Sequence, residues 1–434
     1  MDIQCNDSGK LKQQSAIMTY KITSPQNLCA TVTLPASKSI SNRALIINAL
    51  AGGNDRPSNL SDCDDTEVVV DALDRRPDVI DIKAAGTAMR FMTAYLSVVE
   101  GEHVITGTDR MKHRPISILV DALKNLGADI TYVEEKGYPP LRICGRQLLG
   151  GRLDVPGNTS SQYISALLMI GPSMRNGLEL HLTGNIVSRP YIDLTLFLMK
   201  EYGADVDWTD VDTITVRPRH YTPTPYIVEN DWSASSYWYE MAALYEGRNA
   251  DVSLVGLADG SKQGDSIVKY IYSLLGVKTT FARPGKDESS AVHLTHRMGR
   301  VQWIDFDFIN CPDLAQTVVV TCCALDIPFH FTGLASLKIK ETDRIEALKK
   351  ELRKVGYVIR SKNDSELLWD GTRCEPTFSP IDTYEDHRMA MAFAPLAIKF
   401  GEILINNPEV VSKSYPHFWE DLRLAGFRVE TLSE

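Results

Sequence analysis

The side chains with the clearest chemical potential are cations placed where helices are expected to begin. In LPASKSISNRA, the run ATVTLP is typical of a strand and ISNRALIINALA of a helix, with Ser37 or Ser39 as its N-cap. Lys38 and Arg43 then lie within about one turn of the helix N-terminus. Because that end already carries partial positive charge, cations there indicate a bound anion. A solvated lysine and arginine is the alternative.

Three further segments repeat this arrangement. AGTAMR places Gly86 at a helix start, where the missing side chain lets a ligand approach the backbone, although a simple turn also fits. RMKHRPI concentrates basic residues, Arg114 among them, before a helix that starts at or just after the proline. DHRMAM sets His387 and Arg388 at the start of an apolar helix, and Lys413 follows in SKSYP. One such segment fits a solvated loop, but several favour an anion-binding site.

Two segments place carboxylates where they suit proton transfer. Asp313 follows the strand-like WIDFDF and would lie at a helix N-terminus, where the dipole favours its ionised form. That position suits a general base and also a plain N-cap. In KIKETDR, Lys340 and Arg344 are four residues apart and are expected to share a helix face, with Glu341 near the same turn. This cluster combines acid, base and anion binder, with a surface ion-pair ladder as the alternative.

The overall charge makes these cations more informative. The 434-residue chain has a formal net charge of -10, with 44% hydrophobic and 24% charged residues, as in a globular protein. An acidic chain argues against the basic face that nucleic-acid binding needs, but a cleft can still concentrate positive field. Many cations at helix starts along such a chain predict a pocket that closes around a multiply anionic small molecule.

No metal site, targeting segment or membrane span is expected. The eight cysteines show no CxxC pair and no Cys/His cluster with zinc spacing, so they are predicted to be free thiols, several of them in the core. The polar N-terminus lacks a signal-peptide pattern, and no apolar run approaches the roughly 20 residues that span a bilayer. A cytoplasmic protein with a frayed N-terminal extension of about 18 residues is therefore predicted.

The elements that must position these residues follow a repeat. An amphipathic helix, a glycine and a short β-like run recur every 70 to 80 residues, around Gly127, Gly203, Gly276, Gly356 and Gly426. The glycine lies where a helix C-terminus needs a left-handed residue, and the run after it reads as a strand. About six mixed α/β units are predicted, residues 66–83 being a degenerate first copy, although five such helices also arise by chance. Six units suggest two domains of three, with a crossing between residues 228 and 247.

Taken in order, these segments resemble the 5-enolpyruvylshikimate-3-phosphate synthase family. The resemblance runs from about Leu34 to Phe418 through LPASKSISNRA, AGTAMR, RMKHRPI, SSQ, VSRPYID, QGD, PD, KIKETDR, DHRMAM and SKSYP. It implies two similar α/β domains, each of three βαβαββ units in an inside-out α/β barrel, with the active site in the cleft between them. The implied domains are an inserted one, residues 35–247, and a discontinuous one, residues 1–34 and 248–434.

The resemblance also implies an activity, the transfer of the enolpyruvyl group of phosphoenolpyruvate to the 5-hydroxyl of shikimate 3-phosphate. Phosphate would leave through a tetrahedral intermediate, without metal or organic cofactor, and a monomer is expected. Shikimate 3-phosphate is expected to contact Lys38, Ser39, Arg43, Ser160, Ser161, Gln162, Ser188, Tyr191, Asp313, Ser336 and Lys340. Phosphoenolpyruvate is expected to contact Lys38, Gly86, Arg114, Gln162, Arg344, Arg388 and Lys413. The catalytic groups implied are Asp313 as base, with Lys38, Lys340, Glu341 and His387 in proton transfer.

The chain departs from the family pattern at three positions. Ala84 replaces an asparagine before the Ala-Gly-Thr segment, Ser336 stands where an asparagine is frequent, and Phe91 stands where many relatives carry proline. A related enolpyruvyl transferase acts on UDP-N-acetylglucosamine and uses a loop cysteine, but the comparable stretch 112–114 contains none. The alternatives are therefore that transferase and a non-catalytic binding relative weakened at Ala84 and Ser336.

Overall fold

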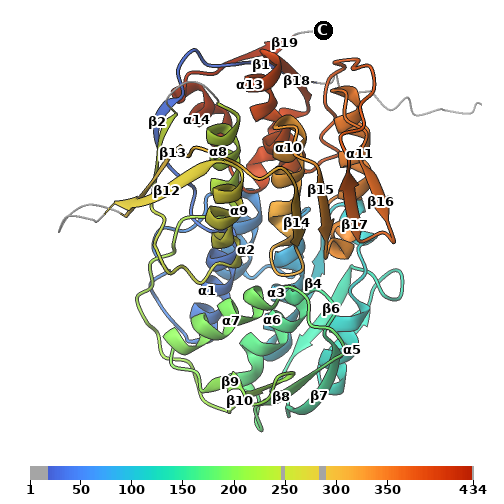
Figure 1. Cartoon of the computed structure of the whole chain (residues 1–434). Coiled ribbons are helices and arrows are strands. Elements are labelled where there is room, and N and C mark those ends of the chain that lie inside the picture. The colour runs from blue at the N-terminus through green and yellow to red at the C-terminus, as the bar shows by residue number, and fades with distance from the viewer. Residues whose placement is uncertain (1–17, 246–249, 283–289, 433–434) are drawn as a thin grey trace, which may run out of the picture.

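The computed structural model describes residues 18–245, 250–282 and 290–432 (Figure 1). Its recurring unit has two helices and four strands, with the first two strands parallel and the others antiparallel to their neighbours. One unit has the sheet order β7-β8-β10-β9 and comprises β7 (Gly151–Pro156), α6 (Ser161–Ile170), β8 (Leu178–Thr183), α7 (Arg189–Glu201), β9 (Val206–Trp208) and β10 (Thr213–Val216). The predicted frayed extension lies outside the described residues apart from Met18.

Three further units have the same strand order. One comprises β3 (Val79–Asp81), α3 (Gly86–Val98), β4 (Gly101–Thr106), α5 (Ser117–Asn125), β5 (Asp129–Tyr132) and β6 (Leu141–Gly145). Another comprises β14 (Ile304–Asp307), α10 (Ala315–Ala324), β15 (Phe329–Thr332), α11 (Arg344–Lys354), β16 (Arg360–Lys362) and β17 (Glu366–Trp369). The third comprises β2 (Cys29–Thr33), α8 (Trp232–Leu244), β11 (Asp251–Val255), α9 (Val268–Leu274), β12 (Val277–Ala282) and β13 (Ala291–His296). Between β2 and α8 of this unit the chain builds other elements, so part of the molecule is inserted there.

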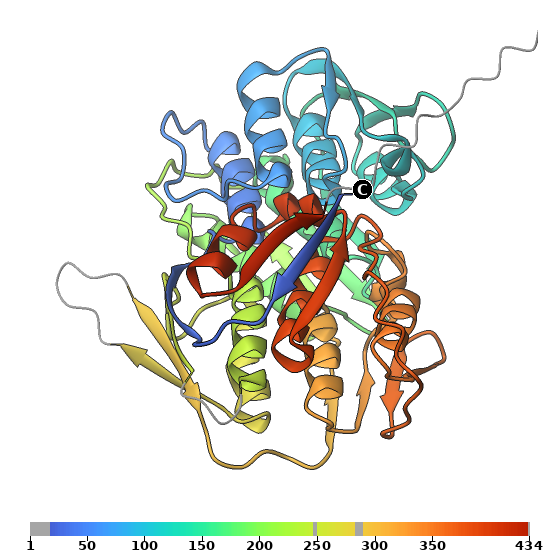
Figure 2. The same cartoon turned by 90° about the horizontal axis from the view of Figure 1, so that it is seen from above.

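The last sheet joins both ends of the described chain. It belongs with α12 (His387–Phe393), α13 (Ala397–Phe400), β18 (Glu402–Asn406), α14 (Phe418–Leu424) and β19 (Arg428–Leu432). The N-terminal strand β1 (Thr19–Thr23) lies between β18 and β19 and is antiparallel to both, as the view from above shows (Figure 2). A parallel bridge between Ile381 and Ile405 occupies the place of a first strand. The N-terminal strand β1 therefore completes a unit whose other elements all come from the C-terminal part of the described chain.

The predicted helix–glycine–strand pattern is confirmed at all five glycines. The glycines join α5 to β5, α7 to β9, α9 to β12, α11 to β16 and α14 to β19, with φ between 83° and 102°. Glycine adopts this left-handed conformation at little cost, so each helix ends where it must. The degenerate copy differs, because after α2 (Asp64–Arg75) the left-handed residue is Arg76, with φ 40°. The strand that follows, β3, starts the next sheet by pairing parallel with β4.

Two buried apolar clusters divide the described chain. One gathers residues from 22–34 and 232–427, and the other gathers residues from 36–228. In the second, α3 packs on α1 (Lys38–Leu50), α2 and α6, and nearly all of α3 and α6 is buried, as expected for helices that are apolar on most sides. We propose that two domains meet where the chain passes between the clusters, at residues 34–36 and 228–232. The predicted boundary at residues 247 and 248 lies outside the described residues.

Candidate active site

A cavity of about 610 Å³ is lined by side chains from both halves of the chain. Every predicted site residue except Lys413 lines it. These residues are Lys38, Ser39, Arg43, Gly86, Arg114, Ser160, Ser161, Gln162, Ser188, Tyr191, Asp313, Ser336, Lys340, Glu341, Arg344, His387 and Arg388. Side chains that were selected from segments far apart in the sequence therefore meet in one place.

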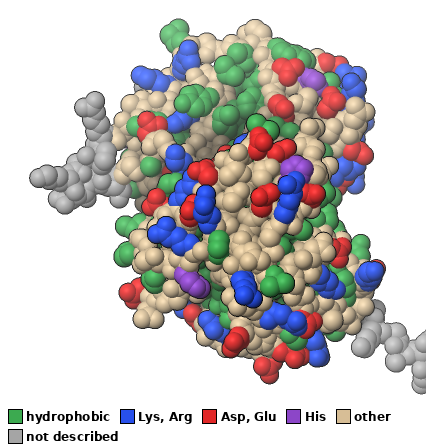
Figure 3. All heavy atoms as spheres, turned by 90° about the horizontal axis from the view of Figure 1, so that it is seen from below, with side chains coloured by type: hydrophobic (Ala, Val, Ile, Leu, Met, Phe, Trp, Pro, Cys, Tyr) green, Lys and Arg blue, Asp and Glu red, His purple; other side chains and the backbone are tan. Residues whose placement is uncertain are grey.

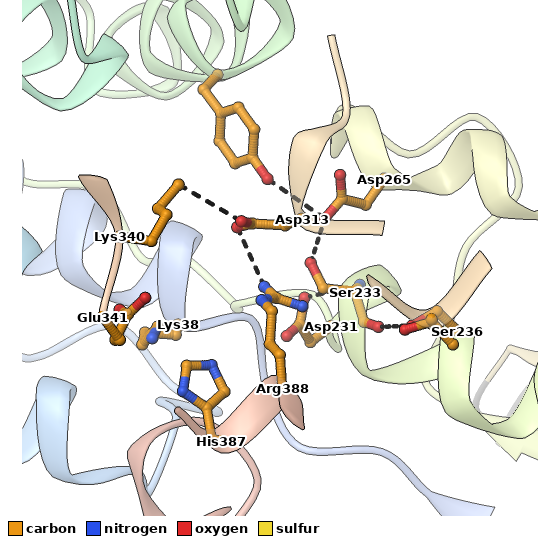
Figure 4. A network of polar contacts seen from close by, with 12 residues as sticks. Lys38, Asp231, Ser233, Ser236, Asp265, Asp313, Lys340, Glu341, His387 and Arg388 are labelled. Carbon is orange, nitrogen blue, oxygen red and sulfur yellow. Dashed lines mark hydrogen bonds and ion pairs between the residues drawn. The ribbon is translucent and has the colours of Figure 1, made fainter. Parts of the chain in front are cut away.

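Asp313 lines this cavity and pairs with three cations, two of which, Lys340 and Arg388, are drawn in Figure 4. Its Oδ1 lies 3.4 Å from the Lys340 ammonium and 3.1 Å from the Arg344 guanidinium, and its Oδ2 lies 3.1 Å from Arg388. Asp313 belongs to a short 3-10 helix, η3 (Pro312–Leu314), that precedes α10, and its side chain caps neither. Burial raises the pKa of Asp313, but the three cations outweigh burial and hold this pKa well below its usual range.

Arg344 connects three carboxylates. Its Nε lies 2.7 Å from Asp386, one terminal nitrogen lies 2.8 Å from Glu341, and the other reaches Asp313. The guanidinium is buried, and burial lowers its pKa, but the carboxylates outweigh burial and the net pKa is raised. Arg344 is the first residue of α11, capped by Asp343, and Lys340 precedes it in extended conformation. The prediction that Lys340 and Arg344 share a helix face is therefore wrong, and the two meet at Asp313 instead.

Glu341 and His387 lie near Lys38 and differ in charge near neutral pH (Figure 4). Burial raises the pKa of Glu341, but Arg344, His387 and Arg114 together hold this pKa well below its usual range. The pKa of His387 is depressed well below 6.5 by burial and by the positive charges of Lys38 and Arg388. Neither ring nitrogen of His387 has a hydrogen-bond partner in the described structure. Near neutral pH an ionised carboxylate therefore lies near an uncharged imidazole.

We expect His387 to make the folded protein sensitive to mild acid. An unfolded chain takes up a proton near the ordinary histidine pKa of 6.5, whereas folded His387 does not, so the unfolded state binds more protons below that pH. The unfolding free energy should fall below about pH 6.5, by at most about 1.4 kcal/mol per pH unit from this group. Urea unfolding of wild type and His387→Gln at neutral and mildly acidic pH measures it. An identical fall in both proteins would contradict the prediction.

Lys38 begins α1 and is paired with a carboxylate that the sequence reasoning missed. Its ammonium lies 3.1 Å from Asp65 in the first turn of α2 and 3.4 Å from the backbone oxygen of Lys413. Burial lowers the pKa of Lys38, but Asp65, Cys63 and Glu341 together outweigh burial, so the net pKa is raised. Ser37 is the N-cap of α1, as predicted, yet its side chain makes no cap hydrogen bond. The three acidic residues in the first turn of α2 are the sequence signal from which Asp65 could have been found.

Arg43 is held by uncharged groups. Its Nε donates to Thr195 at 2.7 Å, one terminal nitrogen donates to Ser165 at 3.1 Å, and the guanidinium lies 5.2 Å from the centre of the Phe91 ring. Burial lowers the pKa of Arg43 to about 10. Phe91, a departure from the family pattern, therefore supports Arg43 from below. No described carboxylate forms an ion pair with Arg43, so its charge is available to an anion in the cavity.

Polar groups at the start of α6 lie close to the start of α3. The Ser160 side chain caps α6 by accepting from the Gln162 backbone. The Gln162 amide donates to Thr87 at 3.0 Å. Thr87 follows Gly86, the first residue of α3, so the two helix starts are held together. The arrangement presents backbone N–H groups and hydroxyls to one region of the cavity.

Two arginines crowd around Gly86. Arg90 donates to the Gly86 carbonyl at 2.8 Å, and a Cβ at position 86 would lie 2.6 Å from Arg114 and 2.9 Å from Arg90. Burial, followed by repulsion from Arg90, lowers the pKa of Arg114 to about 10. Adjacent guanidiniums are stable together when an anion lies between them, so this end of the cavity suits a phosphate or carboxylate. Arg90 lies within the AGTAMR segment but was not selected from the sequence.

Lys413 lines a neighbouring cavity of about 440 Å³ instead. The two cavities share Arg114 and Glu341, and Ala84 lines only the smaller one. The Lys413 ammonium donates to the backbone oxygen of Glu385 at 2.9 Å. The next residue in the chain, Ser414, does line the larger cavity. The predicted contact of Lys413 with phosphoenolpyruvate therefore needs the ligand or the ammonium to extend from one cavity into the other, where Arg114 and Glu341 line both.

On the face seen from below, acidic and basic side chains are interspersed (Figure 3). The described cysteines are free, and those at positions 63, 311, 322 and 323 are buried, as predicted. Among the described residues, no group of three or more His, Cys, Asp or Glu could hold a metal ion. Within the same ranges, no helix has the length and apolar character needed to cross a membrane.

Comparison with known proteins places the chain in a family. The model of the family EPSP synthase (3-phosphoshikimate 1-carboxyvinyltransferase) matches residues 22–422. A Bacteroides fragilis protein named 3-phosphoshikimate 1-carboxyvinyltransferase is 58% identical over 418 residues, which are 96% of this chain and 100% of that protein. The chain belongs to the EPSP synthase family. A Vibrio campbellii member of the same name is 37% identical over 420 residues, 90% of this chain and 96% of its own.

Solved EPSP synthase structures share the fold. Two from Acinetobacter baumannii superpose on this chain with TM-scores of 0.75 and 0.74, at 23% and 22% sequence identity. Each alignment covers 96% of this chain and 100% of the other. The predicted family and the predicted two-domain α/β fold class of EPSP synthases are thereby confirmed.

Proposed function

We infer that this enzyme transfers the enolpyruvyl group of phosphoenolpyruvate to the 5-hydroxyl of shikimate 3-phosphate and releases phosphate. The observation that carries the inference is the single cavity in which Asp313, three cations and Glu341 converge. Both substrates are anions, and each carries a phosphate and a carboxylate. Membership of the EPSP synthase family supports the same reaction. It is a transferase of the shikimate pathway.

We propose that the two substrates divide the cavity. Shikimate 3-phosphate contacts the side containing Lys38, Ser39, Arg43, Ser160, Ser161, Gln162, Ser188, Tyr191, Asp313, Ser336 and Lys340. Phosphoenolpyruvate contacts the side containing Lys38, Gly86, Arg114, Gln162, Arg344 and Arg388, with Lys413 approaching from the smaller cavity. The arginine guanidiniums match carboxylate and phosphate oxygens in pairs, which fixes orientation as well as affinity.

Binding of phosphoenolpyruvate would prepare Asp313 to act as the base. In the structure Arg344 and Arg388 are paired with Asp313, which keeps its pKa too low for efficient proton abstraction. The substrate carboxylate competes for the same two guanidiniums. Once those guanidiniums turn to the substrate, the pKa of Asp313 rises toward the range of a working base.

The reaction then needs two proton movements at the enolpyruvyl methylene. Asp313 takes the proton of the 5-hydroxyl while that oxygen bonds to C2, and a lysine ammonium, Lys38 or Lys340, protonates C3. Cations stabilise the tetrahedral intermediate. Phosphate then leaves C2 as ionised Glu341, with neutral His387 beside it, takes a proton from C3 and restores the double bond.

A methyl group at position 86 is expected to weaken phosphoenolpyruvate binding without unfolding the protein. In Gly86→Ala, the added Cβ displaces the flexible ends of Arg114 and Arg90, while alanine suits a helix start at least as well as glycine. The KM for phosphoenolpyruvate should rise about tenfold or more, as for a lost charged hydrogen bond. Steady-state kinetics and thermal unfolding check both parts, and an unchanged KM would remove Arg114 from this role.

The cellular setting follows from the same inference. We propose that the protein is a cytoplasmic monomer that works without metal or organic cofactor. Both substrates and both products are small, polar metabolites, so no membrane or nucleic-acid partner is required. Size-exclusion chromatography of the purified protein tests the monomer, and a dimer at working concentration would contradict it.

Phosphate release from the purified protein tests the function. Phosphoenolpyruvate would be supplied with shikimate 3-phosphate and, separately, with UDP-N-acetylglucosamine. We expect release with shikimate 3-phosphate alone. Release with UDP-N-acetylglucosamine alone would establish the related transferase instead. No release with either, at high substrate, would support a binding protein, and Ala84→Asn and Ser336→Asn would be the first reversions.

A further inference from the structure

The QGD segment contains a buried carboxylate that the proposed reaction does not use. Asp265 lies in a 3-10 helix, η2 (Gly264–Ile267), and is 2% exposed. Its Oδ2 accepts hydrogen bonds from the Tyr191 hydroxyl at 3.3 Å and from the Ser233 hydroxyl, while its Oδ1 is buried without a described partner. Figure 4 shows Asp265 beside Asp313, between Ser233 and the unlabelled tyrosine ring. A buried carboxylate with such partners needs an explanation.

The contact between Asp265 and Tyr191 joins the two halves of the chain. Tyr191 is in the first turn of α7, in the half formed by residues 36–228, whereas η2 belongs to the other half. Next to Asp265, a Cβ on Gly264 would lie 2.6 Å from Pro190, so only glycine permits this approach. The Ser188 backbone N–H also donates to the Ile309 carbonyl at 2.9 Å. The start of α7 is therefore seated on the opposite half at several points.

We propose that Asp265 is a positioning residue that fixes the Tyr191 ring against the bound shikimate ring. This inference rests on the proposed function, in which Ser188 and Tyr191 contact shikimate 3-phosphate. Tyr191 lines the cavity and Asp265 does not, so Asp265 acts through Tyr191. It holds the phenol by its hydroxyl, at the wall of the cavity. No proton transfer by Asp265 is involved.

The surroundings explain why an acceptor of this kind is needed. Tyr191 and Ser233 each present a hydroxyl hydrogen to the same buried place, and leaving either hydrogen unpaired is unfavourable. Burial, followed by the negative charge of Asp313, raises the pKa of Asp265 to about 6. An amide oxygen would accept from both hydroxyls equally well in geometry. Hydrogen-bond acceptance, rather than charge, is therefore the property that the position requires.

Kinetics and binding of four variants test the proposal. Asp265→Ala and Tyr191→Phe should each raise the KM and the calorimetric Kd for shikimate 3-phosphate about tenfold, with the KM for phosphoenolpyruvate within about twofold of wild type. The double variant should be no worse than either single variant, because both remove the same bond. Asp265→Asn should restore values close to wild type. Asp259→Asn is the matched control, since that carboxylate lies in the turn that precedes η2 and is exposed.

Two outcomes would overturn the proposal. An unchanged KM for shikimate 3-phosphate in Tyr191→Phe, or full additivity in the double variant, would show that the Asp265–Tyr191 bond does not position the ring. If Asp265→Ala fails to fold, Tyr191→Phe and Asp265→Asn decide the matter, since both keep the buried volume. Wild type that neither binds nor turns over shikimate 3-phosphate would instead be a failure of the proposed function. The two failures are thus distinguishable.

Discussion

Asp313→Ala is expected to abolish turnover while leaving the binding of shikimate 3-phosphate nearly intact. Asp313 is the described carboxylate that contacts Lys340, Arg344 and Arg388 together, and in the proposed reaction it takes the proton of the 5-hydroxyl. Losing a general base costs roughly 10²- to 10⁴-fold in rate. Binding should survive, because Arg43 and the polar groups around Ser160 are untouched.

Two measurements separate the outcomes for Asp313. Phosphate release gives kcat, and calorimetry gives the Kd for shikimate 3-phosphate. Asp305→Ala is the control, since Asp305 is an exposed carboxylate on the neighbouring strand β14 and, among the described residues, pairs only with His330. Near-normal turnover in Asp313→Ala would remove this carboxylate from the mechanism. Loss of binding together with turnover would make its role one of substrate contact rather than of proton abstraction.

Arg344→Met is expected to damage stability and activity together. Arg344 is paired with Asp386, which is fully buried, and with Glu341 and Asp313. An apolar side chain of similar length leaves those charges without their shared partner, which costs about 3–5 kcal/mol for a broken buried pair. The same change removes one of the two guanidiniums proposed to hold the carboxylate of phosphoenolpyruvate, so its KM should rise about a hundredfold or more.

Urea unfolding and steady-state kinetics check the two effects of Arg344→Met. Arg353→Met, on the exposed face of the same helix α11, is the control and should be within about 0.5 kcal/mol of wild type. Arg344→Lys should fall between wild type and Arg344→Met, because one ammonium does not reproduce the planar fork of a guanidinium. An Arg344→Met protein as stable as wild type would mean that the buried carboxylates become protonated or find other partners.

Local chemistry explains why the sequence predicted so much of the fold. A helix that must end needs a left-handed residue, and a glycine followed by alternating residues marks that end wherever it occurs. Gly127 and Gly356 lie far apart in the sequence and behave alike for this reason. The cations of the site were predictable in the same way, because a cation at a helix start is a local anomaly.

Contacts between residues that are far apart in the sequence could not be predicted from local patterns. Asp386 lies 42 residues from Arg344, and nothing near either residue indicates that they are partners. The same holds for Asp265 and Tyr191, which are 74 residues apart. Lys340 was misplaced because its spacing from Arg344 fits a helix, whereas Asp343 caps α11 and starts it only at Arg344. Cap residues inside a charged run are hard to recognise from sequence.

The position of β1 between β18 and β19 has a consequence for biosynthesis. A ribosome releases β1 first and β19 last, so the sheet that contains both strands cannot form until synthesis of the described chain is complete. The half formed by residues 36–228 is continuous and can fold while the rest is still being made. We therefore expect nascent chains stalled after residue 245 to protect the continuous half from protease and to leave β1 cleavable. The N-terminal strand would then be among the last elements to pair, because β18 and β19 are made only at the end of translation.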